Sequence, residues 1–300
     1  MLEPHHYLTK NPGKNFRKNL MKALNLWLQV PEERLLIISN AIYMLHNASL
    51  MIDDIQDDSK MRRGVPATHL LYGMPKTIST ALYLCGLALE EIRKLNNPEA
   101  LKIYSEEFSK FQLGQGIELH WRDNVICPTE QEYIDIVVDG KTTALLRMLV
   151  RLMQAESRSS IDCTNLINKF GKLGQITNDF LGFESAQWIE EKGCFCEDVS
   201  EGKFSLPIIH FMTHQSDLVT EQDRLRFMEI LRLRTTNHDI LMEALDLLKR
   251  AKSLDYCRDL LIDLDREIVQ EIRALGGNPM IEHILDKFRF TNKYVLLYRN

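Results

Sequence analysis

Four aspartates, at positions 53, 54, 57 and 58, end an apolar stretch of the chain within the segment LMIDDIQDDSKMRRG (50–64). In a helix each residue turns by about 100°, so Asp53, Asp54 and Asp57 share one side. That side lies near a helix C-terminus, where mutual repulsion and the helix dipole both disfavour carboxylates. A bound cation resolves this conflict, and carboxylate oxygens without histidine or cysteine favour Mg²⁺. The alternative is a solvated acidic helix end.

Basic residues follow the aspartates directly. Arg62 and Arg63 come one to two helical turns later, and guanidinium groups match the oxygens of phosphates. A magnesium site beside arginines predicts a diphosphate ligand; the alternative is that the arginines only neutralise the aspartates. His46 precedes Asp53 by two turns on nearly the same face, so its side chain could reach the same cavity. A lone histidine on an apolar helix is, however, usually structural.

The elements that must position these side chains are helices. Glycine and proline number only 14 and 9, and the stretches between them carry helix formers at helical spacing. The stretch that contains the aspartates begins with Pro31 and two glutamates and is apolar on nearly all sides, which predicts a buried helix. No strand pattern of useful length occurs. We predict further helices over residues 75–95, 98–123, 130–155, 161–187, 205–215, 221–233, 238–250, 253–274 and 279–291, with loops at 123–131 and 190–207.

Length and composition predict a single all-α domain over residues 1–300. The chain is 45% hydrophobic and 26% charged, and we find no repeat, low-complexity segment or linker. A net charge of −5 argues against general nucleic-acid binding. There is no run of about eighteen apolar residues, so we expect no membrane span. The start lacks the apolar core of a secretory signal, and the 6 scattered cysteines predict a reduced protein, so we expect a cytoplasmic location.

Several motifs together resemble the trans-prenyltransferases, specifically the animal geranylgeranyl diphosphate synthases. The resemblance covers nearly the whole chain, and it depends on the segments PGKNFR (12–17), MLHNASLMIDDIQDDSKMRRG (44–64), GQGIELHWRDN (114–124), CPTEQEY (127–133), KTTALL (141–146), FCEDVSEGKFSLP (195–207) and RALGGNP (273–279). It implies the all-α class I isoprenoid synthase fold, a single helical bundle around a central cavity. It also implies a homodimer or a larger homo-oligomer.

The resemblance assigns roles to individual residues. In the family the first aspartate-rich motif is catalytic and contributes ligands for up to three Mg²⁺ ions, and its residues here are Asp53, Asp54 and Asp57. The residues that would hold isopentenyl diphosphate, the extending unit, are Lys14, Arg17 and His46. The arginines that would grip diphosphate are Arg62 and Arg63. The residues expected around the allylic diphosphate are Gln112, Thr142, Gln175, Lys192, Lys203 and Lys141, which is also expected to be catalytic.

The sequence departs from the family at the second aspartate-rich motif. The family pattern is roughly QIRDDYAN, whereas this chain has QITNDFLGF (175–183), so Asn178 replaces the first aspartate and Asp179 is retained. Both are expected to bind metal, although a neutral amide binds Mg²⁺ more weakly than a carboxylate does. Gly182 offers no side chain at the fifth position. In addition, Thr143 and Ala144 replace the glycines of the family's KTGG, which should change the space for the substrate tail.

These departures lead to three hypotheses about function. The main one is a magnesium-dependent terpene synthase derived from a geranylgeranyl diphosphate synthase. It would ionise an allylic prenyl diphosphate, such as geranyl or farnesyl diphosphate, and quench the carbocation to a terpene, with or without residual chain elongation. The alternative is a working geranylgeranyl or farnesyl diphosphate synthase, which the retained isopentenyl site and the small residues Ala48 and Ser49 favour. The third is a non-catalytic subunit of such a synthase.

Overall fold

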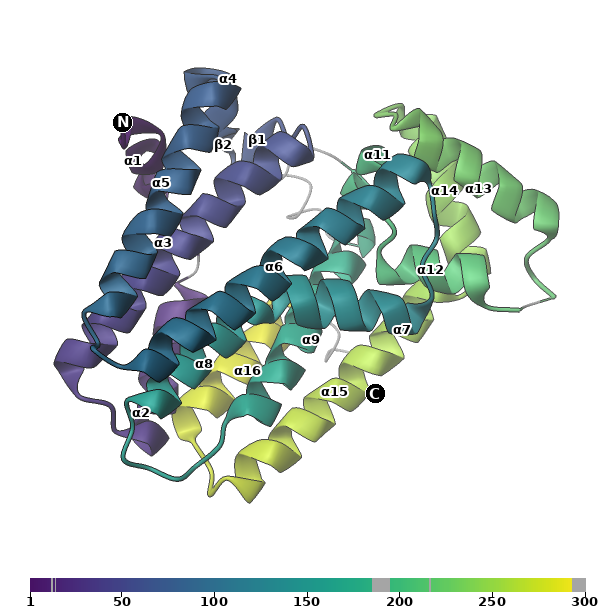
Figure 1. The fold of residues 1–300 in the computed structure, drawn as a ribbon. Helices are drawn as coiled ribbons and strands as arrows, with labels where there is room; N and C mark the ends of the chain where they lie inside the picture. Colours follow the sequence, from purple (N-terminus) through teal and green to yellow (C-terminus); the bar gives the residue numbers. More distant parts are fainter. Residues whose placement is uncertain (12, 14, 185–194, 216, 293–300) are drawn as a thin grey trace.

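The computed structural model describes residues 1–11, 13, 15–184, 195–215 and 217–292, and within them the fold is helical except for one short hairpin (Figure 1). In chain order the elements are α1 (Glu3–Lys10), α2 (Phe16–Leu28), α3 (Glu32–Gln56), β1 (Met61–Arg62), β2 (Val65–Pro66), α4 (Thr68–Tyr72), α5 (Met74–Arg93), α6 (Pro98–Asn124), α7 (Glu130–Tyr133), the π-helix η1 (Ile134–Thr142), α8 (Ala144–Ala155), α9 (Thr164–Glu184), α11 (Glu197–Glu201), α12 (Leu206–Thr213), α13 (Glu221–Leu233), α14 (His238–Arg250), α15 (Ser253–Ala274) and α16 (Pro279–Asn292). The expected all-α fold is therefore confirmed.

Long helices surround the centre of the molecule. α3 lies beside α5, α6 lies beside η1 and α8, and α9 lies beside α15 (Figure 1). One continuous cluster of buried apolar side chains joins α2 to α16, and a smaller cluster joins α1, α3 and α5. Helices with apolar residues on several faces can pack against more than one neighbour, which is how this arrangement encloses a centre.

α3 is the helix predicted to carry the first aspartate motif. It follows Pro31, has two glutamates in its first turn and ends at Gln56, so its predicted bounds are nearly those observed. Its length and composition alone would also suit a membrane span, but the core helix of a soluble protein passes the same test, and α3 packs along α5 and α8. After α3, Asp58 adopts a left-handed conformation, and the chain turns back into the hairpin of β1 and β2.

The single helix predicted over residues 130–155 is instead α7, η1 and α8 in succession. In the π-helix the amide of Thr143 donates to the carbonyl oxygen of Val138 at 2.9 Å, a wider turn than in an α-helix. Thr143 is buried over Gly171, where a Cβ would lie only 2.0 Å from its Oγ1. Neither Thr143 nor Ala144 lines the central cavity, whereas Thr142 and Leu145 do. This corrects the expectation that the two replaced glycines reshape the space for a substrate tail.

Several elements escaped the sequence prediction. α1, α2, α4 and the hairpin were not expected, and α11 lies within the predicted loop 190–207. The remaining predicted helices agree with α5, α6, α9 and α12 to α16 within a few residues at each end. Elements as short as α4, α11 and the two strands contain too few positions for a period to be recognised, whereas α2, with 13 residues, was simply missed.

Gly114 is expected to be required for the close packing of α6 against η1. A Cβ at this position would lie 2.6 Å from the carbonyl oxygen of Ile136 and 2.8 Å from the amide nitrogen of Lys141, both backbone atoms. We expect Gly114→Ala to lower the free energy of unfolding by about 1–3 kcal/mol, because the two helices must separate. Urea unfolding followed by circular dichroism measures this change.

Gly116 provides the matched control on the same helix. No atom lies within 4 Å of a Cβ built there, so Gly116→Ala is expected to stabilise the protein by up to about 1 kcal/mol through helix propensity. Equal urea midpoints for the two variants would show that the contact between α6 and η1 adapts freely, which the packing here does not predict.

Candidate active site

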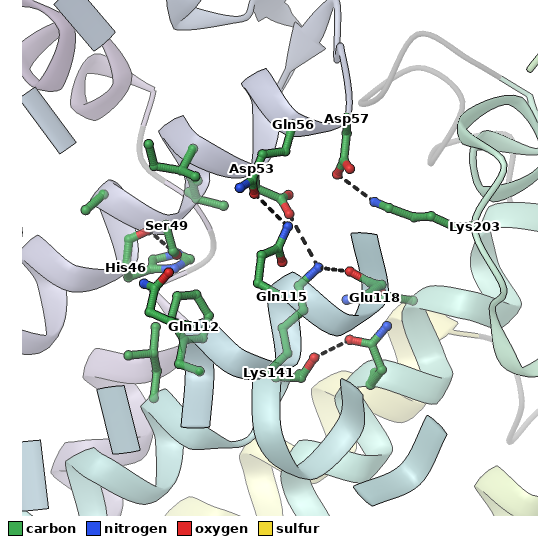
Figure 2. Close-up of a pocket in the computed structure, with 18 of the residues that line it drawn as sticks. His46, Ser49, Asp53, Gln56, Asp57, Gln112, Gln115, Glu118, Lys141 and Lys203 are labelled. Carbon is green, nitrogen blue, oxygen red and sulfur yellow. Dashed lines mark hydrogen bonds and ion pairs between the residues drawn. The ribbon is translucent and has the colours of Figure 1, made fainter. Parts of the chain in front are cut away.

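A cavity of about 540 Å³ lies between α3, α5, α6, η1, α9 and the segment from α11 to α12. Small and apolar side chains of α3, α5, α6 and α8 form part of its lining: Leu45, Ala48, Ala81, Leu82, Cys85, Phe108, Phe111 and Leu145. Charged and polar side chains form the rest, and Figure 2 shows how the labelled ones converge. An apolar cavity with a few convergent polar groups is the usual form of a small-molecule site.

Two aspartates of the first motif face this cavity. Asp53 Oδ1 lies 3.5 Å from Lys141 Nζ, and Asp57 Oδ2 accepts a hydrogen bond from Lys203 Nζ at 2.6 Å (Figure 2). The side chain of Asp53 is 27% exposed and that of Asp57 is 2% exposed. Burial raises the pKa of Asp57, although Lys203 opposes this effect. The cavity therefore holds two carboxylates opposed by two ammonium groups.

Asp54 faces a different direction from the other two motif aspartates. Its side chain is fully buried, does not line the cavity, and accepts a hydrogen bond from Arg62 Nε at 2.7 Å. The hairpin after α3 carries Arg62 back to this carboxylate. Burial alone would lower the pKa of Arg62, but Asp54 raises it above its ordinary value. Asp54 is thus placed as the partner of Arg62, which corrects the expectation that all three carboxylates share the cavity.

Lys141 projects into the cavity from the last turn of η1. It forms ion pairs with Glu118 and Asp53, and it lies opposite the α3 aspartates (Figure 2). Burial alone would lower the pKa of Lys141, but Glu118 and Asp53 raise it, so the ammonium stays charged. Glu118 was not predicted. The signal for it was present in α6, because Gln112, Gln115 and Glu118 are three residues apart and so share one helix face.

The second motif forms the opposite wall, and four of its residues line the cavity: Gln175, Asn178, Asp179 and Gly182. Asn178 is exposed, whereas Asp179 is buried. Asp179 Oδ2 accepts from the Tyr133 hydroxyl at 2.5 Å and from the Leu206 amide at 2.9 Å, and its Oδ1 accepts from Gln175 at 2.8 Å. Burial raises the pKa of Asp179 to about 6. Protein donors thus bond to both oxygens of Asp179, which also lines the cavity, and its role as a metal ligand stays a prediction.

Further polar groups complete the lining, some predicted and some not. Thr142 donates a hydrogen bond to Gln175, which links η1 to α9, and both of these predicted residues face the cavity. α11 adds three acidic side chains that the sequence reasoning did not assign, Glu197, Asp198 and Glu201. Burial, together with the nearby Asp179, raises the pKa of Asp198 to about 7. The four-residue spacing of Glu197 and Glu201 was their only signal in the sequence.

A second group of cations lies beside the first. Arg17 and His46 line both the central cavity and an adjoining one of about 1110 Å³, which Arg63 also lines. Arg17 Nε is buried and makes no hydrogen bond among the described residues. Burial and the charge of Arg63 lower the pKa of Arg17 to about 10. Burial, followed by these two arginines, lowers the pKa of His46 well below its ordinary value, so the imidazole is neutral at pH 7.

The predicted arginine pair is divided between two environments. Arg62 pairs with Asp54, donates to Asp53 Oδ2 at 3.3 Å and lines the central cavity. Arg63 donates from one terminal nitrogen to the carbonyl oxygen of Asn11 at 2.8 Å and lines the adjoining cavity. Gly13 permits this fold of the N-terminal segment, because a Cβ there would lie 2.9 Å from the Arg63 guanidinium. Lys14 and Lys192, also predicted to bind diphosphate, lie outside the described residues.

The carboxylates of α3 form a donor set that fits Mg²⁺, and further carboxylates of the lining lie on α9 and α11. Mg²⁺ commonly takes one or two carboxylates and completes its shell with waters and substrate phosphates, and Asp53 and Asp57 meet that requirement. On the opposite wall Asn178 offers a neutral amide oxygen. Within the described ranges, no three acidic, histidine or cysteine side chains converge closely enough to hold a metal by themselves. The cavity therefore suits a cation that arrives together with a diphosphate.

Comparison with known proteins adds to this geometry. The polyprenyl synthetase family model matches residues 1–248. The chain is 46% identical over 289 residues to a geranylgeranyl pyrophosphate synthase from Mucor circinelloides f. lusitanicus, covering 96% of this chain and 93% of that relative. It is 43% identical over 288 residues to a geranylgeranyl pyrophosphate synthase from Claviceps paspali, with 94% and 84% covered. It is 41% identical over 286 residues to a terpene synthase from Matsumurasca onukii, with 95% and 92% covered.

Proposed function

Because the chain belongs to the polyprenyl synthetase family, we propose that it is a trans-prenyltransferase that condenses isopentenyl diphosphate with an allylic diphosphate, as a geranylgeranyl diphosphate synthase does. The proposal reverses the order of the hypotheses drawn from the sequence, in which a terpene synthase came first. Relatives named geranylgeranyl pyrophosphate synthase support this order. One observation of the structure carries it: among the described residues, cations line the cavity in two separate groups.

The second cation group is the observation that favours condensation. Arg63 is close enough to lower the pKa of Arg17, and Arg17 has a buried N–H without an acceptor among the described residues. Buried like charges and an unsatisfied buried donor are both costly, and a bound anion removes both costs. A terpene synthase needs to bind one diphosphate. A prenyltransferase needs to bind two, and Lys141 and Lys203 already provide cations for the first.

Each wall then has a distinct part in the reaction. Asp53 and Asp57 would hold Mg²⁺, which when bound neutralises charge on the allylic diphosphate. Lys141 and Lys203 stabilise the negative charge that develops on the leaving diphosphate, because their ammonium groups are already oriented in the cavity. The apolar part of the lining excludes water from the carbocation. Small Ala48 and Ser49 in that lining leave room beside α3.

A terpene synthase is the second candidate, and Asn178 is the observation that favours it. This neutral side chain lines the cavity beside Asp179, whose oxygens accept hydrogen bonds from protein donors. A wall with one carboxylate fewer holds the metal and the diphosphate less tightly, which favours loss of a proton over condensation. The 41% identity with a terpene synthase from Matsumurasca onukii is consistent with this candidate.

One assay separates the candidates. Purified protein with Mg²⁺ receives geranyl, farnesyl or geranylgeranyl diphosphate, with and without isopentenyl diphosphate, and the products are identified by mass spectrometry. We expect a longer prenyl diphosphate, formed only when isopentenyl diphosphate is present. A hydrocarbon or alcohol formed without it would instead support the terpene synthase. No turnover, but a changed product from a co-expressed synthase, would support a non-catalytic subunit.

Asn178→Asp tests the role of the second wall. Restoring a carboxylate opposite Asp53 is expected to increase the ratio of condensation product to unextended product by roughly tenfold, because metal sites respond to a changed ligand on that scale. Asn168→Asp is the matched control, since Asn168 lies on the same helix and contacts Arg147 outside the cavity. The ratio is measured with both substrates present. An unchanged ratio in Asn178→Asp would contradict the role given to this wall.

Two further expectations from the sequence stay predictions. We propose that the chain self-associates through α4, α5 and α6, which carry several exposed apolar side chains: Leu70, Leu71, Met74, Ile78, Leu82, Tyr83, Leu101 and Leu113. Groups of exposed apolar side chains often become buried in a protein interface. We also propose a cytoplasmic location, which rests on the sequence alone.

A further inference from the structure

Asp57, at the C-terminus of α3, is held by two cations from different elements. Its Oδ1 accepts a hydrogen bond from a terminal nitrogen of Arg122 on α6 at 3.0 Å, and its Oδ2 accepts from Lys203 Nζ at 2.6 Å. Its position is intrinsically unfavourable for an anion, because it is nearly fully buried and lies at the negative end of a helix. The two cations therefore compensate the buried charge of this carboxylate and fix its orientation.

The Arg122 guanidinium is fixed by several contacts. The same terminal nitrogen donates to the carbonyl oxygen of Gln56, the last residue of α3, at 2.9 Å. Its Nε donates to Asp123 Oδ1 at 3.0 Å, and Asp123 in turn accepts from Arg234, at the end of α13, at 2.8 Å. The side chain of Arg122 is only 9% exposed and does not line the cavity. Arg122 thus supports Asp57 from behind and is not in a position to touch a substrate.

Lys203 is attached differently. It reaches Asp57 from the opposite side of the cavity, as Figure 2 shows, and it lines the cavity itself. Its second partner is Glu201, at 2.7 Å, which lies on its own segment and moves with it. Releasing Asp57 would therefore leave Lys203 paired with Glu201, whereas releasing Arg122 would also break the cap on α3 and the link to α13. Of the two cations, Lys203 is therefore the one that can leave Asp57 with fewer broken contacts.

We propose that Arg122 is a positioning residue for the metal-binding wall: it holds Oδ1 of Asp57 so that Oδ2, which pairs with Lys203, stays directed into the cavity, where it would hold a divalent cation. Lys203, once released from Asp57, would be able to meet the diphosphate that accompanies the cation. No bond other than hydrogen bonds and ion pairs changes. This inference rests on the proposed function, because it assigns Arg122 to the site that the proposed reaction uses.

The test measures metal binding directly. Mn²⁺ binding to the whole protein is followed by electron paramagnetic resonance in the presence of inorganic pyrophosphate, and thermal unfolding is measured with EDTA. We expect Arg122→Gln to weaken Mn²⁺ binding by roughly 10- to 100-fold, the range found when a group that orients a metal ligand is lost. Arg122→Lys, which retains the charge but not all the hydrogen bonds, should recover part of the affinity.

Arg147→Gln is the matched control. Arg147 is also a buried arginine with several hydrogen bonds, to Glu107 and Asp139, but it lies outside the cavity lining. The Arg147→Gln substitution should lower Tm without changing the affinity for Mn²⁺. If Arg122→Gln does not fold, the Mn²⁺ affinity of Arg122→Lys is compared with that of the wild-type protein instead. Affinity within about twofold of wild type in the folded Arg122 variant would overturn the inference. Failure of the wild-type protein to bind Mn²⁺ with pyrophosphate, or to turn over any allylic diphosphate, would instead count against the proposed function.

Discussion

Asp53→Asn is expected to lower the turnover number for chain elongation by roughly 10²- to 10³-fold, the scale on which one preorganised electrostatic group contributes to a rate. Asp53 is the motif carboxylate most open to the cavity, and it faces Lys141 across it. The amide preserves its shape but removes the charge that attracts the divalent cation. Because Lys141 keeps its ion pair with Glu118, the fold should hold and Tm should change little. Incorporation of labelled isopentenyl diphosphate over a series of Mg²⁺ concentrations measures the effect.

Asp58→Asn provides the matched control for this substitution. Asp58 belongs to the same run of aspartates and loses the same charge, but its side chain is 80% exposed, pairs with Lys60 and lies outside the cavity lining. Exposed ion pairs contribute about 0–1 kcal/mol, so its rate and stability should stay near those of wild type. Equal losses in the two variants would mean that only the net charge of the segment matters. Retention of more than about a tenth of the rate by Asp53→Asn would contradict the assigned role.

Helical periodicity predicted which face of α3 carries the motif side chains, but it did not predict which other residues contact them. Asp53 and Asp57 were correctly placed on one face, and the apolar residues before them correctly predicted a buried helix. Asp54 was misplaced because the hairpin, whose strands have two residues each, returns Arg62 to it. A spacing rule within one helix contains no information about a turn that begins after that helix ends. Arg62 therefore neutralises Asp54, but it also lines the cavity, so its predicted contact with a diphosphate stays a prediction.

The second wall shows the same limit over longer distances in the chain. Asp179 looks like a metal ligand in the sequence, yet its partners are the Tyr133 hydroxyl and the Leu206 amide, 46 and 27 residues away. Only the packing of α9 against α7 and α12 brings these donors together. Arg122 was missed for a similar reason: its segment was recognised as a motif, but its contact with Asp57 spans 65 residues. Resemblance to a family supplied Arg17 and His46, which periodicity alone could not have joined.

Arg17→Gln is expected to raise the KM for isopentenyl diphosphate by roughly 30- to 150-fold, which corresponds to the loss of one charged hydrogen bond of about 2–3 kcal/mol. Arg17 lies beside Arg63 and His46, and its buried Nε has no acceptor among the described residues. A diphosphate oxygen would be that acceptor. The KM for the allylic diphosphate should change much less, because the other cation group, which contains Lys141, is intact. Steady-state kinetics with each substrate varied in turn gives both constants.

The stability of Arg17→Gln should distinguish a binding residue from a structural one. Burial and the charge of Arg63 both lower the pKa of Arg17, which means that its positive charge is disfavoured in the folded protein. Removing that charge should leave Tm unchanged or raise it, as happens at sites where strain serves function. Lys10→Gln, at the exposed end of α1, is the control for net charge. A fall in Tm without a selective rise in the KM for isopentenyl diphosphate would show that Arg17 stabilises the fold and binds no second diphosphate. The second group of cations would then no longer support a prenyltransferase over a terpene synthase.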